Sequence, residues 1–411
     1  MLWRVALAGL VALGVLFGGL HWRAASYGAG PKQTSGAPAS PVREIAFVAN
    51  AVEGTVTLID IAEARPIGMI DIKPDGTRVS LFRDPAQWIA QPVLERSGGL
   101  NYAQDTDLSR DGTVLYVSRG HLADVVAIDL SSGDILWRTP IAGVRADHMD
   151  MSPDGRRLFV SAVIRGGNRV QALSTETGRI LGDFRAGDWP HDVHVSKDGQ
   201  RVYVASLGDM LADLAERSER PNAYSITVAD TNTFGIRKTY AFDAGIRPFD
   251  VSPAADVIYA QLSNTHAIVT YDLNTRQIVR RIDLPIADGV TEDDWDFEAP
   301  HHGLALTADG VHLCAAGRAS DYAALVAAND LSLVAAVPVG DAPSWAVLAA
   351  DDTLCLVANT RSDDVSFVDL KTQTETARLA AGRGPKHITV GKVPQRVIDA
   401  FQSADARQLT E

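Results

Sequence analysis

The sequence predicts an all-β fold, a seven-bladed β-propeller, from a repeated hairpin, a third strand that follows each hairpin, and complementary half-units at the two ends of the repeats. Each hairpin has two strands of alternating apolar and polar residues. In the clearest copies the turn is Ser/Thr-x-Asp-Gly, and Asp-Gly is among the strongest short hairpin signals. Four clear copies begin at Asp105, Asp147, His191 and His302, and two looser ones begin at Arg247 and Ser344.

The third strand of each unit provides a second periodic signal. It usually ends in an aspartate, namely Asp60, Asp129, Asp230, Asp272, Asp330 and Asp369, with Ser174 in the exceptional unit. A short turn then leads to a fourth strand. Four antiparallel strands repeated at about forty residues are typical of a propeller. The alternative, a β-sandwich, gives no reason for one motif to recur.

The two ends of the repeat region predict how the ring closes. Residues 45–72 supply three strands without a first one, and residues 384–391 supply a first strand with nothing after it. Together they complete one blade, which removes the exposed sheet edges of an open array. We therefore expect the propeller to span residues 45–393, with residues 394–411 as a C-terminal tail.

The N-terminus predicts export. Residues 1–23 contain an apolar run from Val5 to Leu20, which fits a signal anchor or a signal peptide. The anchor is favoured because no good cleavage site follows, and residues 2–22 would then lie in the membrane. Residues 24–44, rich in Ala, Gly, Ser and Pro, are expected to form a flexible linker. Either way, the propeller would lie on the periplasmic or extracellular side of the cytoplasmic membrane, anchored or secreted.

Composition narrows the chemistry. The formal net charge of −13 and the lack of a basic cluster argue against nucleic acid as the main partner. Cys314 and Cys355 are the only cysteines, and we favour two buried thiols, although a disulfide depends on geometry that the sequence does not give. Two cysteines cannot form a thiolate-rich metal site.

The strand motifs also indicate a family. The segments YVAS at 203–206, FVAN at 47–50 and LVAN at 356–359, each followed by a loop and a strand ending in aspartate, resemble the YVTN-type seven-bladed propellers (the YVTN repeat-like or quinoprotein amine dehydrogenase-like family). The resemblance covers residues 45–393. It implies the fold, while the function must come from the site, since such propellers include enzymes, ligand binders and surface scaffolds.

The residues just before each first strand point to the site. In a propeller these strands line the central channel, and five of the ten histidines fall at their beginnings. Histidine is the commonest metal ligand, and inward histidines from several blades can bind copper, iron or zinc without cysteine. The metal candidates are His148, His191, His302 and His387, with Asp296 and Glu298 as possible carboxylate ligands. The further ligand-binding candidates are Asp105, Asp192, Arg247, His301 and Trp345. The alternative is a solvated channel lining without a bound ion.

Part of this pattern resembles nitrous-oxide reductase, whose propeller offers Pro-His-Gly-type blade starts to a copper cluster. Residues 300–303, PHHG, and Pro190-His191 match in part. The pattern departs from that family at Asp105, Arg247 and Trp345. A multicopper cluster is therefore not expected.

Three long loops, 73–103, 208–223 and 287–300, are expected on the same face as the histidines, where they would form a lid or a rim for a partner.

Three functions fit these features. The first is an exported propeller that binds a metal ion or polar small ligand, as a periplasmic oxidoreductase-like or accessory protein. The second is a lactonase-like hydrolase. The third is a membrane-tethered scaffold that binds a protein at its loop-rich face.

Overall fold

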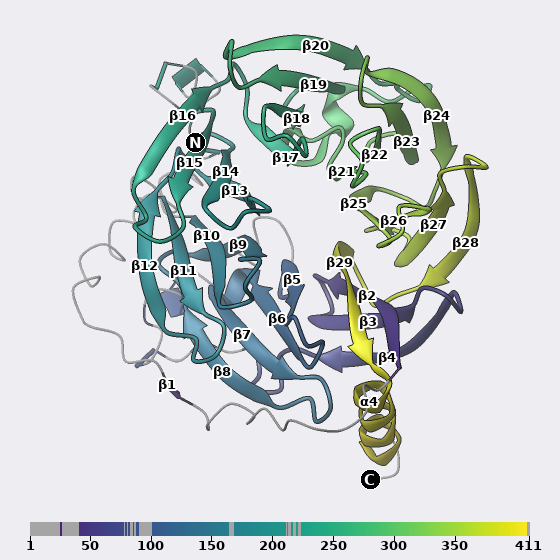
Figure 1. Ribbon diagram of the computed structural model, residues 1–411. Helices are drawn as coiled ribbons and strands as arrows, with labels where there is room; N and C mark the ends of the chain where they lie inside the picture. Colours follow the sequence, from purple (N-terminus) through teal and green to yellow (C-terminus); the bar gives the residue numbers. More distant parts are fainter. Residues whose placement is uncertain are drawn as a thin grey trace.

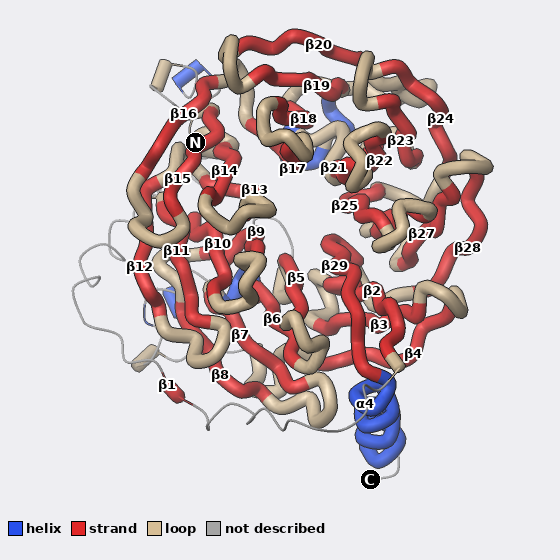
Figure 2. The backbone as a smooth tube through the Cα atoms, viewed as in Figure 1, coloured by secondary structure: helices blue, strands red, loops and turns tan. Residues whose placement is uncertain are grey.

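The computed structural model describes residues 25–26, 41–77, 79, 81–82, 85, 88–89, 101–163, 168–210, 212, 215–216, 219–220 and 223–408. Seven sheets are arranged around a central channel, so the predicted seven-bladed propeller is confirmed (Figures 1 and 2). The apolar segment 1–23 lies outside the described residues. Among the helices that are described, none combines the length and the apolar character needed to cross a membrane.

Each blade is a four-stranded antiparallel sheet whose first strand lies innermost. Blade 1 comprises β29 (Pro385–Pro394), β2 (Val42–Asn50), β3 (Thr55–Asp60) and β4 (Arg65–Asp71), and blade 2 comprises β5 (Asp105–Leu108), β6 (Val114–Arg119), β7 (Asp124–Asp129) and β8 (Ile135–Pro140). Blade 3 comprises β9 (Arg145–Met151), β10 (Arg157–Val163), β11 (Arg169–Ser174) and β12 (Ile180–Arg185), and blade 4 comprises β13 (Pro190–Val195), β14 (Arg201–Ser206), β15 (Ser225–Asp230) and β16 (Ile236–Ala241).

Blade 5 comprises β17 (Ile246–Val251), β18 (Val257–Leu262), β19 (Ala267–Asp272) and β20 (Gln277–Asp283). Blade 6 comprises β21 (Leu304–Leu306), β22 (His312–Gly317), β23 (Tyr322–Ala327) and β24 (Ser332–Pro338). Blade 7 comprises β25 (Pro343–Leu348), β26 (Leu354–Asn359), β27 (Asp364–Asp369) and β28 (Thr374–Ala380). The short 3-10 helices are η1 (Gly120–Leu122), η2 (Glu292–Asp294) and η3 (Asp296–Glu298).

Blade 1 joins the two ends of the propeller, as the half-units predict. The C-terminal strand β29 pairs along the whole of β2, from Val42 opposite Pro394 to Asn50 opposite Pro385. Strand β2 begins three residues before the predicted start of the propeller at residue 45. Within the expected linker, Ala25–Ser26 also form a short strand, β1, that pairs with β8. The C-terminal tail forms the helix α4 (Gln395–Gln408).

The hydrophobic core is divided among the interfaces between blades. Because side chains alternate across a strand, each sheet presents apolar residues to both neighbouring blades. Phe47 of blade 1, for example, packs in one cluster with Leu115 of blade 2, and Phe249 of blade 5 packs with Tyr203 of blade 4. Seven such clusters follow one another around the ring.

Aspartates on the inner strands also connect neighbouring blades. A carboxylate of one blade accepts the backbone N–H of the next blade's first strand: Asp105 from Met149 at 2.9 Å, and Asp192 from Phe249 at 3.1 Å. Asp150 and Asp250 do the same with Val195 and Leu306. Hydrogen bonds to charged groups contribute about 1.5–3 kcal/mol each. These bonds therefore hold the channel-lining strands in a fixed relation to one another.

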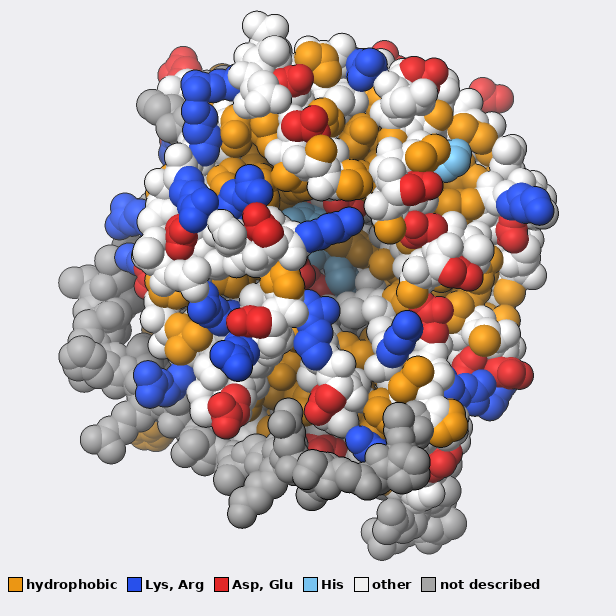
Figure 3. All heavy atoms as spheres, in the orientation of Figure 1, with side chains coloured by type: hydrophobic (Ala, Val, Ile, Leu, Met, Phe, Trp, Pro, Cys, Tyr) orange, Lys and Arg blue, Asp and Glu red, His pale blue; other side chains and the backbone are white. Residues whose placement is uncertain are grey.

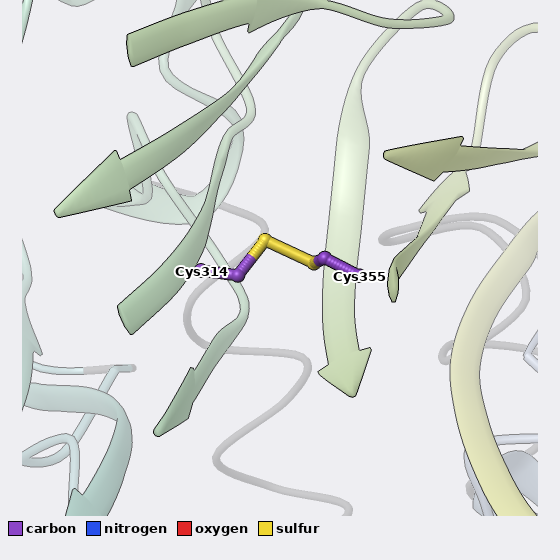
Figure 4. The surroundings of a disulfide bond; sticks show 2 residues. All are labelled: Cys314 and Cys355. Carbon is purple, nitrogen blue, oxygen red and sulfur yellow. A yellow bond between two sulfur atoms is a disulfide. The ribbon is translucent and has the colours of Figure 1, made fainter. Parts of the chain in front are cut away.

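The two cysteines form a disulfide between blades 6 and 7, with 6.5 Å between their Cα atoms (Figure 4). Our preference for two free buried thiols was wrong. The residues lie on β22 and β26, the second strands of neighbouring blades, and both side chains point into the shared apolar interface. The alternation along a strand shows which residues leave a sheet, but not which of them face each other across two sheets.

Candidate metal centre

Three histidines from three different blades meet at the end of the channel where the inner strands begin. His148 lies on β9, His191 on β13, and His302 two residues before β21. One ring nitrogen from each lies within 4.8 Å of the other two. The Nε2 atoms of His191 and His302 are 3.4 Å apart. Two ligands of a tetrahedral ion with bonds of 2.0–2.1 Å lie about 3.4 Å from each other, so this spacing suits a shared ion.

The environment keeps two of these rings neutral. Burial lowers the pKa of His191 well below its ordinary value, and the neighbouring His148 and His302 disfavour its protonation further. Burial likewise lowers the pKa of His302, with added effects from Lys386 and Arg247. A neutral imidazole carries a free lone pair, which is the form that binds a metal.

His302 and His148 are also oriented for this role. Nδ1 of His302 donates a hydrogen bond to the carbonyl oxygen of Ser344 at 2.8 Å, which leaves Nε2 with its lone pair toward His191. Nδ1 of His148 lies 3.0 Å from Oδ2 of Asp105. A second-shell carboxylate of this kind fixes the tautomer and raises the basicity of the other ring nitrogen.

Asp105 connects a fourth histidine to the cluster. Its Oδ1 lies 2.8 Å from Nδ1 of His387, while its Oδ2 contacts His148. Burial alone would raise the pKa of Asp105, but His387 and His148 outweigh it and hold the pKa well below the usual range. Burial would also lower the pKa of His148, but its hydrogen bond to Asp105 and the charge of Asp105 raise it. His148 therefore holds a proton more tightly than the other two rings, and a metal would compete with that proton.

Aromatic packing and a glutamine complete the surroundings. The ring of Trp345 stacks on His148 with centroids 4.8 Å apart and planes at 20°, and it lies 4.2 Å from the ring of His387. Nε2 of Gln104 lies 3.2 Å from Nε2 of His148 and donates to Asp147 at 2.5 Å. All three histidines are more than nine-tenths buried, which removes competing water from the cluster.

The structure separates the sequence candidates into two groups. His148, His191 and His302 form the cluster, and Asp105, His387 and Trp345 adjoin it. Asp192 instead bonds His194 at 3.2 Å and the backbone of blade 5. Arg247 is buried with its Nε donating to Ser263, and its charge acts on His191 and His302.

The remaining candidates lie apart from the cluster. His301 is turned to the carbonyl oxygen of Thr265 at 2.5 Å. Asp296 pairs with Arg318 and Arg361 at 2.9 and 2.8 Å, and Glu298 bonds Asn264. Neither carboxylate belongs to the metal-compatible groups found among the described residues. The Asp296 pairs place the 287–300 loop beside Arg318, which in turn bonds Ser344 at the histidine end of the channel.

Sequence reasoning did not select four residues of this region: Gln104, Arg145, Arg318 and Lys386. Gln104 and Lys386 directly precede the inner-strand residues that it did select, so their position alone was a usable signal. Arg145 and Arg318 had none, because their places follow from the course of β9 and from the turn after β22.

The inner strands also carry a second set of ionisable side chains. His194 lies near Asp192, Asp150 and Asp250. Burial would lower its pKa, but the charge of Asp192 and a hydrogen bond to it raise the pKa of His194 to about 10. Burial raises the pKa of Asp150 to about 6.

Figure 3, which views the molecule as in Figure 1, shows a hollow at the centre of the ring with histidine side chains inside it.

Comparison with known proteins supports the fold alone. No protein-family model and no curated protein sequence matches the chain. Among solved structures, hydrazine synthase of Kuenenia stuttgartiensis is similar with a TM-score of 0.60 and 16% identity, covering 79% of this chain and 91% of that one. A proposed 6-phosphogluconolactonase of Bacteroides fragilis is similar with a TM-score of 0.60 and 12% identity, covering 88% and 99%. The YVTN-type resemblance stays a prediction, because no family model supports it.

Proposed function

We propose that this protein is an exported β-propeller that binds one divalent metal ion through His148, His191 and His302. The observation that carries the proposal is the convergence of three ring nitrogens within 4.8 Å from three separate blades. Nothing local in the chain explains it, because these residues are 43 and 111 positions apart in sequence. Channel lining needs polar residues, but it does not need buried histidines whose nitrogens face each other.

The donor set suits copper, iron or zinc. Imidazole is a ligand of intermediate softness that suits all three metals, and three histidines with an open fourth position are the pattern of catalytic zinc sites. An ion held in this way would act as a Lewis acid or activate a bound water molecule. The chain's own part is to orient the rings: Asp105 and Trp345 hold His148, and the carbonyl of Ser344 holds His302.

Two features support export. The apolar segment 1–23 is of the kind that directs a chain to the membrane. The Cys314–Cys355 disulfide is of the kind that persists in oxidising compartments and is rare in the cytosol. In the periplasm or on the outer side of the membrane, this propeller would serve as a metal-dependent enzyme or as an accessory protein that binds a small ligand.

A second candidate function is hydrolysis of a lactone. It is favoured by His148, which Asp105 orients, together with the cations Arg247 and Lys386 that act on the same cluster. A histidine and nearby cations could activate water and polarise a carbonyl. One structural neighbour carries the name of such an enzyme. Lactone turnover by metal-free protein would favour this candidate over the metal-dependent one.

Metal content tests the proposal. The purified protein is stripped with a chelator, dialysed separately against Zn²⁺ and Cu²⁺, and analysed for bound metal per chain. We expect about one equivalent of one of these ions, and a loss of most of it in His148→Ala, His191→Ala or His302→Ala. His312, an exposed histidine on β22, provides the matched control, and His312→Ala should bind metal as the natural protein does. Thermal melts confirm that each variant is folded. Wild-type protein without bound metal would contradict the proposal.

A further inference from the structure

Four cations lie on strands and turns next to the residues of the histidine cluster. Lys386 directly precedes His387 on β29, Arg145 begins β9, Arg247 lies on β17, and Arg318 follows β22. Hydrogen bonds connect two of them to the cluster: Arg145 donates to Oε1 of Gln104 at 3.0 Å, and Nε2 of Gln104 lies 3.2 Å from Nε2 of His148. Arg318 bonds the hydroxyl of Ser344, the residue whose carbonyl oxygen accepts from His302. The charges of Lys386 and Arg247 also act on both His191 and His302. Four different blades therefore bring positive charge to one place in a protein whose net charge is −13.

Three of these cations lie further out than the histidines, whereas Arg247 is as buried as His191. The side chains of Arg145 and Arg318 are 27% and 16% exposed, whereas His148, His191 and His302 are 1%, 4% and 7% exposed. Lys386 is also partly exposed. A solute that approaches the cluster from this end of the channel would therefore meet the cations first.

The positive charges are only partly compensated. Arg145 lies 3.5 Å from Asp147, and Arg318 pairs with Asp296 at 2.9 Å. Nζ of Lys386 has no hydrogen bond or ion pair within the described part of the chain, and the buried Nε of Arg145 has no hydrogen-bond partner there. The third nearby carboxylate, Asp105, is engaged by His148 and His387. A partly buried cation with few partners is costly, and one bound anion would offset this cost.

We propose that the ligand of the histidine cluster is a small anion, a carboxylate or an oxyanion, that Lys386 and Arg145 hold above His191 and His302. This inference rests on the proposed metal function and adds the chemical class of its ligand. The arginines offer planar, directional donors, and Lys386 offers a compact positive charge. Burial lowers the pKa of Lys386 to about 7, and a bound anion would stabilise its charged form. An anion placed there would have its other end toward the open side of the three-histidine cluster.

Binding to metal-free protein tests the inference separately from the metal. Inorganic phosphate, acetate and the neutral acetamide are titrated calorimetrically into the chelator-treated full chain. We expect phosphate or acetate to bind and acetamide not to bind, and phosphate against acetate distinguishes an oxyanion from a carboxylate ligand. Lys386→Met should weaken anion binding at least about tenfold, as expected for the loss of one charged contact, and Lys386→Arg should retain most of it. Lys197→Met, which removes an exposed lysine from the turn between β13 and β14, should change nothing.

Zinc uptake by the same variants separates the two proposals. Lys386→Met should still bind zinc, because it leaves all three ring nitrogens in place. Equal binding of acetate and acetamide, or unchanged anion affinity in Lys386→Met, would overturn the anion inference even if zinc binds. Wild-type protein that binds anions but no zinc would contradict the metal function and leave the anion site standing.

Discussion

Asp105 contacts two histidines and two blades at the candidate centre. One carboxylate oxygen contacts His148 and the backbone N–H of Met149, and the other lies 2.8 Å from His387. The same residue thus joins blade 2 to blade 3 and orients one of the three proposed metal ligands. Asp192 has the matching structural position, since it joins blade 4 to blade 5 through Phe249, but it contacts none of the three cluster histidines directly.

This pair permits a controlled test. Asp105→Asn should lower zinc affinity about 10–100-fold, because it removes the charged second-shell partner of His148. Asp192→Asn weakens an equivalent contact between blades but leaves the hydrogen bond between His148 and Asp105 in place, so it should lower zinc affinity much less than Asp105→Asn. Competition titrations against a chromophoric chelator measure both values. Equal zinc affinity in the two variants would show that Asp105 has only a structural role.

At the scale of elements, the disulfide ties β22 to β26 across one of the seven interfaces between blades. The bonded residues are 41 positions apart, and a loop of that size corresponds to about 4 kcal/mol in the chain-entropy model. We expect a Cys314→Ala/Cys355→Ala variant to unfold with about 2–5 kcal/mol less stability than the oxidised protein in urea titrations.

The reducing agent supplies the control for that prediction. Because the variant has no thiols, added reductant should lower the stability of the natural protein toward that of the variant and leave the variant unchanged. Thiol titration of unfolded natural protein should find no free thiol. Two titratable thiols per chain in protein taken from its native compartment would contradict both the disulfide and the export that it supports.

At the scale of the whole molecule, the ring depends on pairing between the two ends of the propeller. Removal of residues 384–411 deletes β29 and α4, including Ile388, Val393 and Phe401, which pack in the clusters on either side of blade 1. The loss exposes β2 as an edge strand and opens the ring. We expect the truncated protein to aggregate or to lose its cooperative thermal transition. A removal of only residues 404–411 is the control, because it leaves β29 and most of α4 in place. If the protein without residues 384–411 melts like the natural chain, this account of ring closure is contradicted.

The sequence predicted the repeated features of the fold better than it predicted which side chains meet in space. Asp-Gly turns and alternating strands are local, so they predicted seven blades and the closing strand, because each repeat reports the same local physics. The blade starts also identified His148, His191 and His302. The contacts of the other candidate side chains depend on how far each one reaches across the channel, which the sequence does not give. Asp296 pairs with Arg318 rather than with a histidine, and the charge of Arg145 acts on Lys386 from a different blade. The pairing of Cys314 with Cys355 could not be predicted for the same reason.

The central claim is that three imidazoles from blades 3, 4 and 6 share one ion, and X-ray absorption at the zinc edge tests it most directly. For protein loaded with one equivalent of zinc, the account predicts a first shell with about three nitrogen ligands at roughly 2.0–2.1 Å and the outer-shell scattering of imidazole rings. His302→Ala should reduce the imidazole count by about one, whereas His312→Ala should leave it unchanged. A first shell made of oxygen, or an imidazole count that does not respond to His148, His191 or His302, would contradict the account.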